Sequence, residues 1–304
     1  MGSVEERQAR YSAERLVKEK GFTHIKWNGL TPGPITDCKE RIVSVLCGKP
    51  GDKSYDEAAS RVHHQMAEAY RSDQDHKRGA FPACNAGVSM GMGNSRPVRL
   101  KPKGLKGFVD GVMKDKDMRR IVGYHNQAFK TWAPRLFEKY QNVRDTVRAK
   151  TGLADNFENS VWMASGFNLG GNVWTWKHRD PLNWACGWCS ITALGAFDPT
   201  RSGQLVLWEL ELVIDFPAGS TIMIPSACIT HSNTPIVEGD CRTSFTQYSA
   251  GAIFRWVENG CRTEKEYKEQ DPKGFAKMMK AKGNALERRL ENFSTMTELL
   301  DVVQ

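Results

Sequence analysis

The residues whose types and spacing would let them do chemistry together are His178, Asp180 and His231. His178 and Asp180 stand two apart in the segment NVWTWKHRD, whose Val, Thr and Trp content is typical of a strand. Side chains two apart on a strand leave the same face, so both can contact one metal ion. His231 would complete two histidines and one carboxylate, the facial triad of non-haem Fe(II) oxygenases. The alternative is that each histidine is a hydrogen-bonded core residue.

An arginine eleven positions after His231 extends this pattern. Gly239 and Asp240 predict a turn, and a hairpin there would bring Arg242 back beside the strand of His231. The guanidinium can bind a carboxylate through two parallel hydrogen bonds, and Ser244 would add a hydroxyl on the same face. The distal carboxylate of 2-oxoglutarate suits this pair. The alternative requires an internal Asp or Glu as partner, because a buried unpaired arginine is costly.

The elements that must position these residues divide the chain into three regions. Residues 1–158 predict helices over 4–20, 56–73 and 117–150 and a glycine-rich loop at 78–97 that together wrap a core. Residues 159–258 contain Val-, Ile-, Thr-, Trp- and Phe-rich runs between turn residues, which predict a β-core. Residues 259–304 predict a basic helical tail. We therefore expect one α+β domain over residues 1–304.

Composition narrows the classes of function. A chain of 304 residues with 40% hydrophobic and 26% charged residues is typical of a globular protein with a sizeable core. The formal net charge of +8 favours a polyanionic partner, and basic residues gather at 96–120 and in KGFAKMMKAKGNALERR. The alternative is that these runs are merely solvated faces. With no apolar run long enough for a membrane helix and no apolar leader, we expect a cytoplasmic or nuclear protein without a membrane partner.

Cys186 and Cys189 have the CxxC spacing of some zinc and redox sites. A zinc site would need a second CxxC or a histidine pair at matching spacing, and the sequence has neither. The surrounding WACGWCSITALGAF is typical of a buried strand, where cysteine behaves as a small hydrophobe. We therefore expect both cysteines to be core residues.

The longer segments around these residues resemble the TET/JBP family of Fe(II)- and 2-oxoglutarate-dependent base dioxygenases, and within it the fungal, basidiomycete branch that is associated with transposons. The resemblance covers residues 22–268. It is carried by FNLGGNVWTWKHRDPLNWACGWCSITALGAFDPTRSGQLVLWELELVIDFPAGSTIMIPSACITHSNTPI, by RTSFTQYSAGAIFRWVENG, and upstream by RGAFPACNAGVSMGMGNSRP and WAPRLFEKY. It implies a double-stranded β-helix core of the jelly-roll or cupin type, wrapped by helices at both ends.

The resemblance also implies a site and a reaction. Fe(II) would be held by His178, Asp180 and His231, and 2-oxoglutarate by Arg242 with Ser244. With dioxygen, these would oxidise the methyl group of 5-methylcytosine in double-stranded DNA, stepwise to the hydroxymethyl, formyl and carboxyl forms. Because a methyl group inside a duplex is out of reach of a buried iron, the base would have to be flipped out. We therefore expect a nuclear, monomeric enzyme.

Contacts to the substrate are implied at several polar residues. Asn183 matches a base-contacting position of the family, although it has an alternative role in capping the turn after Asp180. Asn94 and Arg96, at the end of the glycine-rich loop, are candidates for the pocket wall or a DNA-facing loop. Four basic residues are candidates for contacts to the DNA backbone: Arg99, Lys101, Lys103 and Lys106.

One position departs from the family pattern. Eight residues beyond Arg242, where the family's animal and protist enzymes have a second base-contacting histidine, this chain has Ala250. The alternatives are therefore an N6-methyladenine demethylase, which would release formaldehyde, a catalytically idle DNA-binding protein that serves a transposon, and a dioxygenase of RNA, protein or a small molecule. The retained triad and Arg242 argue against the idle protein, and the net charge argues against the last group.

Overall fold

Two β-sheets form the centre of the protein. The computed structural model describes residues 6, 8–69, 78–102 and 104–301. In this part of the chain the larger sheet is antiparallel throughout, with the strand order β2 (Gly33–Thr36), β3 (Ile42–Gly48), β10 (Thr221–Ile224), β7 (Cys189–Ala196), β12 (Cys241–Tyr248), β6 (Ala164–Asn168), β4 (Ala83–Ser89) and β5 (Val98–Arg99). The smaller sheet has the order β1 (Thr23–Ile25), β9 (Leu212–Ile214), β8 (Leu205–Leu207) and β11 (His231–Asn233).

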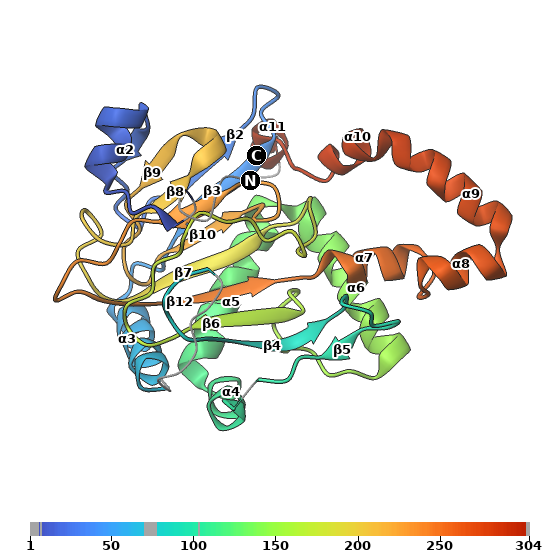
Figure 1. Cartoon of the computed structure of the whole chain (residues 1–304), viewed down its shortest axis with the longest axis horizontal. Coiled ribbons are helices and arrows are strands. Elements are labelled where there is room, and N and C mark those ends of the chain that lie inside the picture. Colours follow the sequence, from blue (N-terminus) through green and yellow to red (C-terminus); the bar gives the residue numbers. More distant parts are fainter. Residues whose placement is uncertain (1–5, 7, 70–77, 103, 302–304) are drawn as a thin grey trace.

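The larger sheet is covered on both faces. Helices α3 (Lys53–Glu68), α5 (Lys116–Trp132) and α6 (Pro134–Thr151) lie on one face (Figure 1). The smaller sheet lies on the other, where its Leu207 shares a buried cluster with Ile222 and Ile224 of β10. The intervening Met223 belongs to the cluster on the helix side. Since successive side chains of a strand point to opposite faces, β10 is apolar on both and forms a continuous hydrophobic run.

Further helices frame this core. They are α2 (Ala13–Lys20), α4 (Lys106–Val112), α7 (Gly251–Glu258), α8 (Glu264–Gln270), α9 (Pro272–Ala281), α10 (Ala285–Leu290) and α11 (Met296–Asp301). The N-terminal helix ends at Gly21 in the left-handed conformation (φ 74°), as its sequence predicts, but it begins at Ala13 rather than at residue 4, because Ser12 caps it through the N–H of Arg15. The mixed α+β architecture and the helical tail are confirmed.

The expected division of the chain needs one correction. Residues 1–158 are not only helices and loops, because β1 to β5 lie among them and four of these strands extend the larger sheet. In β4 the residues are small, and Gly87 has a positive φ of 100°. A Cβ there would lie 2.3 Å from the carbonyl oxygen of Met163. The backbone of β4 therefore lies very close to that of Met163, which requires small residues. Because β4 has no pattern of large apolar residues, hydrophobic periodicity does not predict it.

Two segments inside the expected β-core also differ from prediction. The run NVWTWKHRD is not a regular strand, since its β-bridges, at Asn172 and His178, are isolated ones. Residues 251–258 form helix α7 rather than the end of a strand, because Ile253, Phe254 and Trp256 are spaced to bury one helical side against the core.

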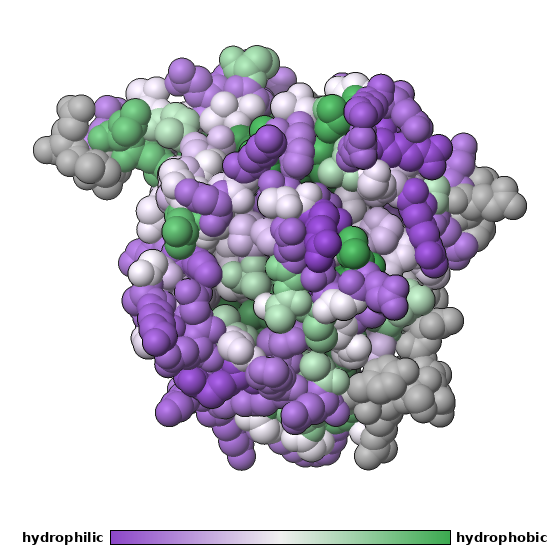
Figure 2. All heavy atoms as spheres, turned by 90° about the vertical axis from the view of Figure 1, so that its left-hand side faces the viewer, coloured by the Kyte–Doolittle hydropathy of each residue, from purple (hydrophilic) through white to green (hydrophobic). Residues whose placement is uncertain are grey.

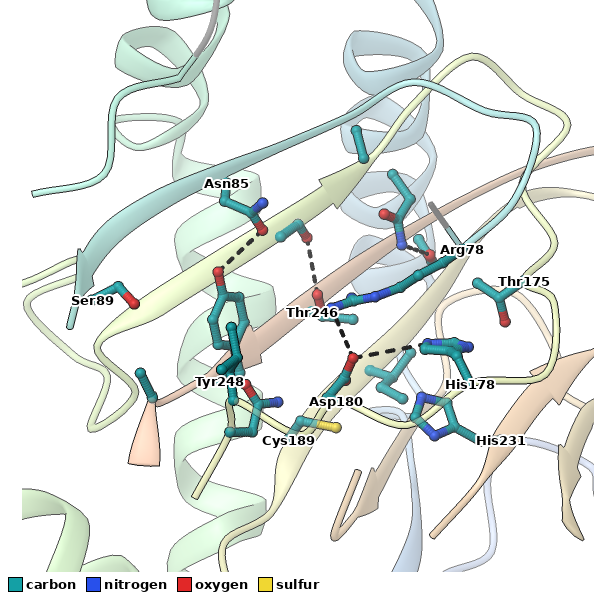
Figure 3. A pocket seen from close by; sticks show the side chains of 18 of the residues that line it. Arg78, Asn85, Ser89, Thr175, His178, Asp180, Cys189, His231, Thr246 and Tyr248 are labelled. Atoms are coloured by element: carbon teal, nitrogen blue, oxygen red, sulfur yellow. Dashed lines mark hydrogen bonds and ion pairs between the residues drawn. The ribbon is translucent and has the colours of Figure 1, made fainter. Parts of the chain in front are cut away.

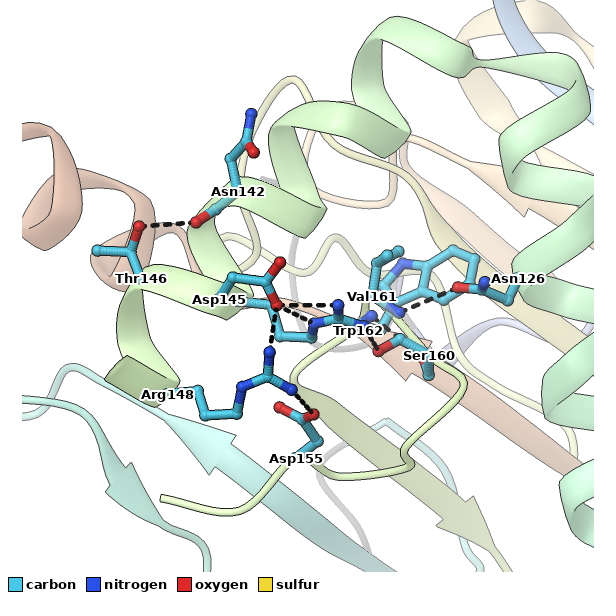
Figure 4. Close-up of polar contacts among 10 residues, drawn as sticks. Asn126, Asn142, Asp145, Thr146, Arg148, Asp155, Ser160, Val161 and Trp162 are labelled. Atoms are coloured by element: carbon cyan, nitrogen blue, oxygen red, sulfur yellow. Dashed lines mark hydrogen bonds and ion pairs between the residues drawn. The ribbon is translucent and has the colours of Figure 1, made fainter. Parts of the chain in front are cut away.

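A network of polar contacts fixes the chain just before β6. Arg144 of α6 donates to the carbonyl oxygen of Ser160 at 3.0 Å, and Arg148 joins Asp145 at 3.1 Å to Asp155 at 3.0 Å (Figure 4). Because β6 pairs with β12 along its length, these contacts also hold the strand that carries Arg242.

Hydrophilic residues cover most of the face seen in Figure 2, and hydrophobic residues appear there in small groups. Among the described residues, few large apolar side chains are strongly exposed, and two of them, Met92 and Leu182, line the same cavity. None of the described helices combines the length and the hydropathy needed to cross a membrane.

Candidate metal centre and its cavity

The structure brings His178, Asp180 and His231 together. One possible ligand atom from each lies within 4.8 Å of the others, and the two imidazole rings are 4.3 Å apart between centroids. The histidines also pair through their backbones, with N–H to carbonyl distances of 3.0 and 2.9 Å in the two directions. The extended segment of His178 is therefore aligned by β11 itself. Further backbone hydrogen bonds, from Asn233 to the carbonyl oxygen of Thr175 at 3.0 Å and from Asp180 to that of Ser226 at 2.9 Å, hold the segment although it is not a regular strand.

Each imidazole is oriented by a carbonyl oxygen of its own chain segment. Nδ1 of His178 lies 2.7 Å from the oxygen of Trp176, and Nδ1 of His231 lies 3.0 Å from that of Ile229. A carbonyl can only accept, so each Nδ1 carries the proton and each Nε2 lone pair remains for a metal. Burial lowers the pKa of His178 to about 3 and also lowers the pKa of His231. Both rings are therefore neutral at pH 7, the form that binds metal.

Asp180 supplies the carboxylate and is paired with an arginine that the sequence reasoning missed. Its Oδ1 is 2.8 Å from Nη2 of Arg78, although the two groups are not aligned for a hydrogen bond. Burial alone would raise the pKa of Asp180, but the opposing effects, of which the positive charge of Arg78 is the largest, outweigh it and leave the pKa below its ordinary value. The carboxylate is thus ionised in the ligand-free protein, and Oδ1 is 3.9 Å from Nε2 of His178.

Arg242 lies on the central strand β12 and is 1% exposed. It donates one hydrogen bond, from Nη1 to the carbonyl oxygen of Val173 at 2.8 Å, and its Nε has no partner. In the described part of the chain no carboxylate pairs with it, which removes the alternative of an internal ion pair there. Burial lowers its pKa to about 10, so it still carries its charge at pH 7. A buried guanidinium in this condition fits an anionic ligand.

The polar face of β12 continues from Arg242 into a cavity. Alternate residues Ser244, Thr246 and Tyr248 all line it, as the two-residue period of a strand requires. The Ser244 hydroxyl accepts a hydrogen bond from the amide of Asn168 at 2.8 Å, which leaves its own proton free to donate. Ser244 thus lines the same cavity as Arg242, with a hydroxyl that can donate to a ligand there.

The cavity has a volume of about 340 Å³ and opens above the metal centre. Figure 3 shows His178, Asp180 and His231 at one side of it, with Tyr248, Asn85 and Ser89 further along. Its walls combine polar groups from β12 with Phe81, Ile191 and Phe216. A volume in the range of ligand pockets, with apolar walls and a few convergent polar groups, suits a small molecule beside the metal centre.

The residues expected to contact a substrate lie at different places. Asn183 lines the cavity, and its amide donates to the hydroxyl of Ser226 at 3.0 Å. Its backbone N–H also closes a turn with Asp180 at 2.9 Å, so the capping role belongs to the backbone and leaves the side chain facing the cavity. Asn94 lines the cavity from an exposed turn at Gly91, whereas Arg96 is exposed outside it.

Of the residues expected to contact the DNA backbone, the three that the structure describes are exposed, and two of them have partners within the chain. Arg99 donates to the carbonyl oxygen of Ala154 at 2.8 Å, and Lys106 pairs with Asp110. Lys101 is exposed. Lys103 lies outside the residues that the structure describes.

Three residues of the site, Arg78, Asn85 and Tyr248, were not found from the sequence. Arg78 could not be, because only the fold brings it to Asp180. Tyr248 had a signal in its even spacing from Arg242. Its hydroxyl donates to the amide oxygen of Asn85, on β4, at 3.1 Å, and burial raises its pKa to about 12, so the phenol stays neutral.

Comparison with solved structures identifies the fold. NgTET1 in complex with 5mC DNA is similar, with a TM-score of 0.55, 13% identity, and coverage of 75% of this chain and 81% of that one. This chain has the NgTET1 fold. The predicted double-stranded β-helix is thereby confirmed, with the two facing sheets as its halves. A 2OG-Fe(II) oxygenase from Burkholderia pseudomallei is also similar, with 15% identity, a TM-score of 0.34 and coverage of 62% and 76%. No protein-family model and no curated protein matches the chain.

The donor set of this site fits Fe(II) and 2-oxoglutarate. Two neutral imidazoles and one carboxylate are the ligands of the facial triad, which leaves positions open for a cosubstrate. The unpaired guanidinium of Arg242 and the hydroxyl of Ser244 open into the same cavity and suit the far carboxylate of a short dicarboxylate. The predicted pair of cofactors is therefore consistent with the polar groups at both ends of the site.

Proposed function

We propose that this protein is an Fe(II)- and 2-oxoglutarate-dependent dioxygenase of the TET/JBP family that oxidises 5-methylcytosine in double-stranded DNA. One observation carries the proposal: an imidazole, carboxylate and imidazole cluster shares a cavity with a buried arginine that has no anionic partner in the described chain. A metal site alone would not need the arginine, and an anion site alone would not need the three ligands.

When bound, Fe(II) with 2-oxoglutarate supplies the oxidation of a C–H bond by dioxygen, with succinate and carbon dioxide as coproducts. The chain orients the groups that bind them. Carbonyl oxygens aim the two imidazoles, Arg78 holds the carboxylate of Asp180 in its ionised form, and Arg242 with Ser244 grips the far carboxylate. Since these groups are already in place, little rearrangement is needed when ligands bind.

The far part of the cavity supports a flat, polar substrate. Tyr248 offers an aromatic ring, and the amides of Asn85 and Asn183 can each donate and accept. A flipped base is recognised by stacking and by hydrogen bonds to its edge, which this set provides. The complex of NgTET1 with 5mC DNA supports the same class of substrate on the same fold. The net charge of +8 supports a polyanion, and such a substrate would place the enzyme in the nucleus.

The test is to incubate the protein with Fe(II), ascorbate, 2-oxoglutarate and a duplex that contains 5-methylcytosine, and to measure the digested nucleosides by mass spectrometry. We expect hydroxymethyl-, formyl- and carboxylcytosine from the wild type. The variant His178→Ala should form none, and His64→Ala, which removes an exposed histidine of α3, should match the wild type.

A second duplex tests the identity of the base. Ala250 is buried at the cavity wall where a histidine of the related enzymes would read the base. Formaldehyde release from a duplex with N6-methyladenine, without oxidation of 5-methylcytosine, would assign adenine as the substrate. No oxidised base and no formaldehyde from either duplex would refute the proposal.

A further inference from the structure

Residues 262–291 form an arm that leaves the body of the protein and returns to it. The arm begins after α7, whose Ile253, Phe254 and Trp256 are buried in the core, and it projects outward through α8, α9 and α10 (Figure 1). It returns where Phe293 and Ser294 are buried again. The backbone N–H of Ile42 donates to the carbonyl oxygen of Ser294 at 2.9 Å. Both ends of the arm are therefore anchored.

No residue of α8 or α9 is buried against the body, yet the two helices are ordered by contacts with each other. The rings of Tyr267 and Phe275 meet edge to face, 5.9 Å apart between centroids. Lys282 pairs with Glu264 at 3.0 Å, and the side chain of Asp271 caps α9 through the N–H of Gly274 at 2.8 Å. The arm is thus a helical hairpin in which Tyr267 and Phe275 pack between the helices, while Met279 is exposed.

This packing determines which side of α9 faces the solvent. Lys273, Lys277 and Lys280 are four and three residues apart and fall on one side of the helix, opposite Phe275. All three are exposed, α9 itself contains no acidic residue, and within the described chain none of them forms an ion pair. At 1.5 Å per residue the row is about 10 Å long. It is a line of three unneutralised positive charges on a helix that the core does not need.

We propose that the lysine row of α9 binds the phosphate backbone of the DNA that flanks the base in the cavity. The three ammonium groups span a distance comparable to three phosphates of one strand, which carries a charge every ~3.4 Å along the axis. The arm is joined to the cavity through α7, which starts at Gly251, directly after the cavity residue Ala250. The choice of DNA as the polyanion rests on the proposed function.

A membrane surface fits the arm less well. An amphipathic helix that lies on a membrane inserts its apolar side between lipids, and in α9 that side contacts α8 through Phe275 and Tyr267. Phosphates of a duplex require only the lysine row, which α9 presents to solvent, whereas Met279 is the one strongly exposed large apolar side chain of α9 in the described chain. The observations therefore favour a regular polyanion.

The experiment compares two triple variants with the wild type for binding of an unmethylated duplex over a series of salt concentrations. Lys273→Gln, Lys277→Gln and Lys280→Gln together remove the row but keep helix propensity. The control replaces Lys20, Lys26 and Lys53 by glutamine, which removes the same net charge at exposed positions, two of them on α2 and α3 at the opposite end of the molecule from the arm (Figure 1). Fluorescence anisotropy of a labelled duplex gives the affinities.

The plot of log affinity against log salt has a negative slope, and we expect its magnitude to decrease by about 2 to 3 in the arm variant. This corresponds to about 0.9 for each phosphate that the lysines no longer neutralise. In the control the slope should stay unchanged. An unchanged slope in the arm variant, an equal fall in both variants, or weaker binding to phosphatidylserine vesicles without weaker binding to DNA would overturn the inference. Unaltered circular dichroism and thermal unfolding would show that the arm variant is folded.

The outcome is separable from that of the proposed function. If the wild type oxidises 5-methylcytosine but the arm variant keeps its salt slope, only the inference about the arm fails. If the slope falls in the arm variant while the wild type oxidises no base, only the proposed reaction fails.

Discussion

Replacing Arg242 by methionine should separate ligand binding from folding. The guanidinium is 1% exposed, and burial lowers its pKa from 12.5 to about 10. At 1.36 kcal/mol per pKa unit this shift corresponds to a cost of about 3 kcal/mol for keeping the charge in the folded protein. Because the folded pKa is below the unfolded one, the full cost is present at every pH below the folded pKa and is relieved only as the pH rises above it.

Methionine fills much of the same space without a charge. The variant loses the hydrogen bond to the carbonyl oxygen of Val173, and an unsatisfied buried carbonyl costs about 1–3 kcal/mol. The two effects have opposite signs, so we expect the free energy of unfolding of the ligand-free variant to be unchanged or raised by up to about 2 kcal/mol. If Arg242 serves a ligand and has no anionic partner in the described chain, its removal should therefore not harm the fold.

The wild type and Arg242→Met should differ in how much 2-oxoglutarate stabilises them. With Mn(II) present throughout, 2-oxoglutarate at a hundred times its Kd should stabilise the wild type by about 2.7 kcal/mol, whereas Arg242→Met, which keeps the metal ligands, should gain almost nothing from 2-oxoglutarate. Urea unfolding in Mn(II), with and without 2-oxoglutarate, measures the difference. A ligand-free Arg242→Met protein that is destabilised by more than about 2 kcal/mol, yet keeps the response to 2-oxoglutarate, would show that the arginine is structural.

Arg144→Met is the matched control for this experiment. Arg144 has partners of both kinds, a carboxylate in Asp145 at 2.9 Å and the carbonyl oxygen of Ser160 at 3.0 Å, whereas Arg242 has only a carbonyl (Figure 4). Its replacement should lower stability with or without ligands and leave the gain from 2-oxoglutarate intact.

Four further changes test the rest of the site and the core. Asn183→Ala should abolish oxidation of the base, while 2-oxoglutarate is still converted to succinate. Loss of both products would indicate a structural role. Tyr248→Phe, which removes the donor to Asn85, should lower kcat/KM for the methylated duplex about tenfold, for ~1.4 kcal/mol of lost hydrogen bonding, with the KM for 2-oxoglutarate unchanged. Asp180→Asn should weaken Mn(II) binding at least about tenfold by electron paramagnetic resonance, and equal affinity would remove it from the ligand set. Burial lowers the pKa of His125 to about 3, so its contribution to stability is present above its unfolded pKa and is lost as the pH falls towards 3. Between pH 7 and 5, the free energy of unfolding of His125→Gln, measured with urea, should therefore decrease by about 2 kcal/mol less than that of the wild type. Equal decreases would show that His125 does not have a lowered pKa in the folded protein.

The part of the site that could be predicted from the sequence is the part that depends on local geometry. His178 with Asp180, and Arg242 with Ser244, are two-residue pairs, and extended backbone places such pairs on one side whether or not the segment is a regular strand. That is why His178 and Asp180 lie together although their segment makes only isolated bridges. The turn near Gly239 is equally local, because it depends on the residues at the turn.

The missed residues depend on tertiary pairing. Arg78 reaches Asp180 only because the chain folds back over about a hundred residues, and no periodicity links the two. Asn85 meets Tyr248 because β4 pairs with β6 and β6 with β12, so the strand that the sequence did not reveal is the one that carries it. The end of β12 was misplaced for a related reason, since the run after Ala250 is as apolar as a strand but has the period of a helix.

Backbone hydrogen bonds hold both halves of the site. Arg242 stands on β12, which pairs with β6 on one side and β7 on the other. The segment of His178 and Asp180 is no regular strand, yet it exchanges backbone hydrogen bonds with His231 in both directions, and the N–H of Asp180 donates to the carbonyl oxygen of Ser226 at 2.9 Å. The anion-binding group and the metal-ligating side chains are therefore both positioned by the protein itself, and a metal ion would bind to groups that are already in place.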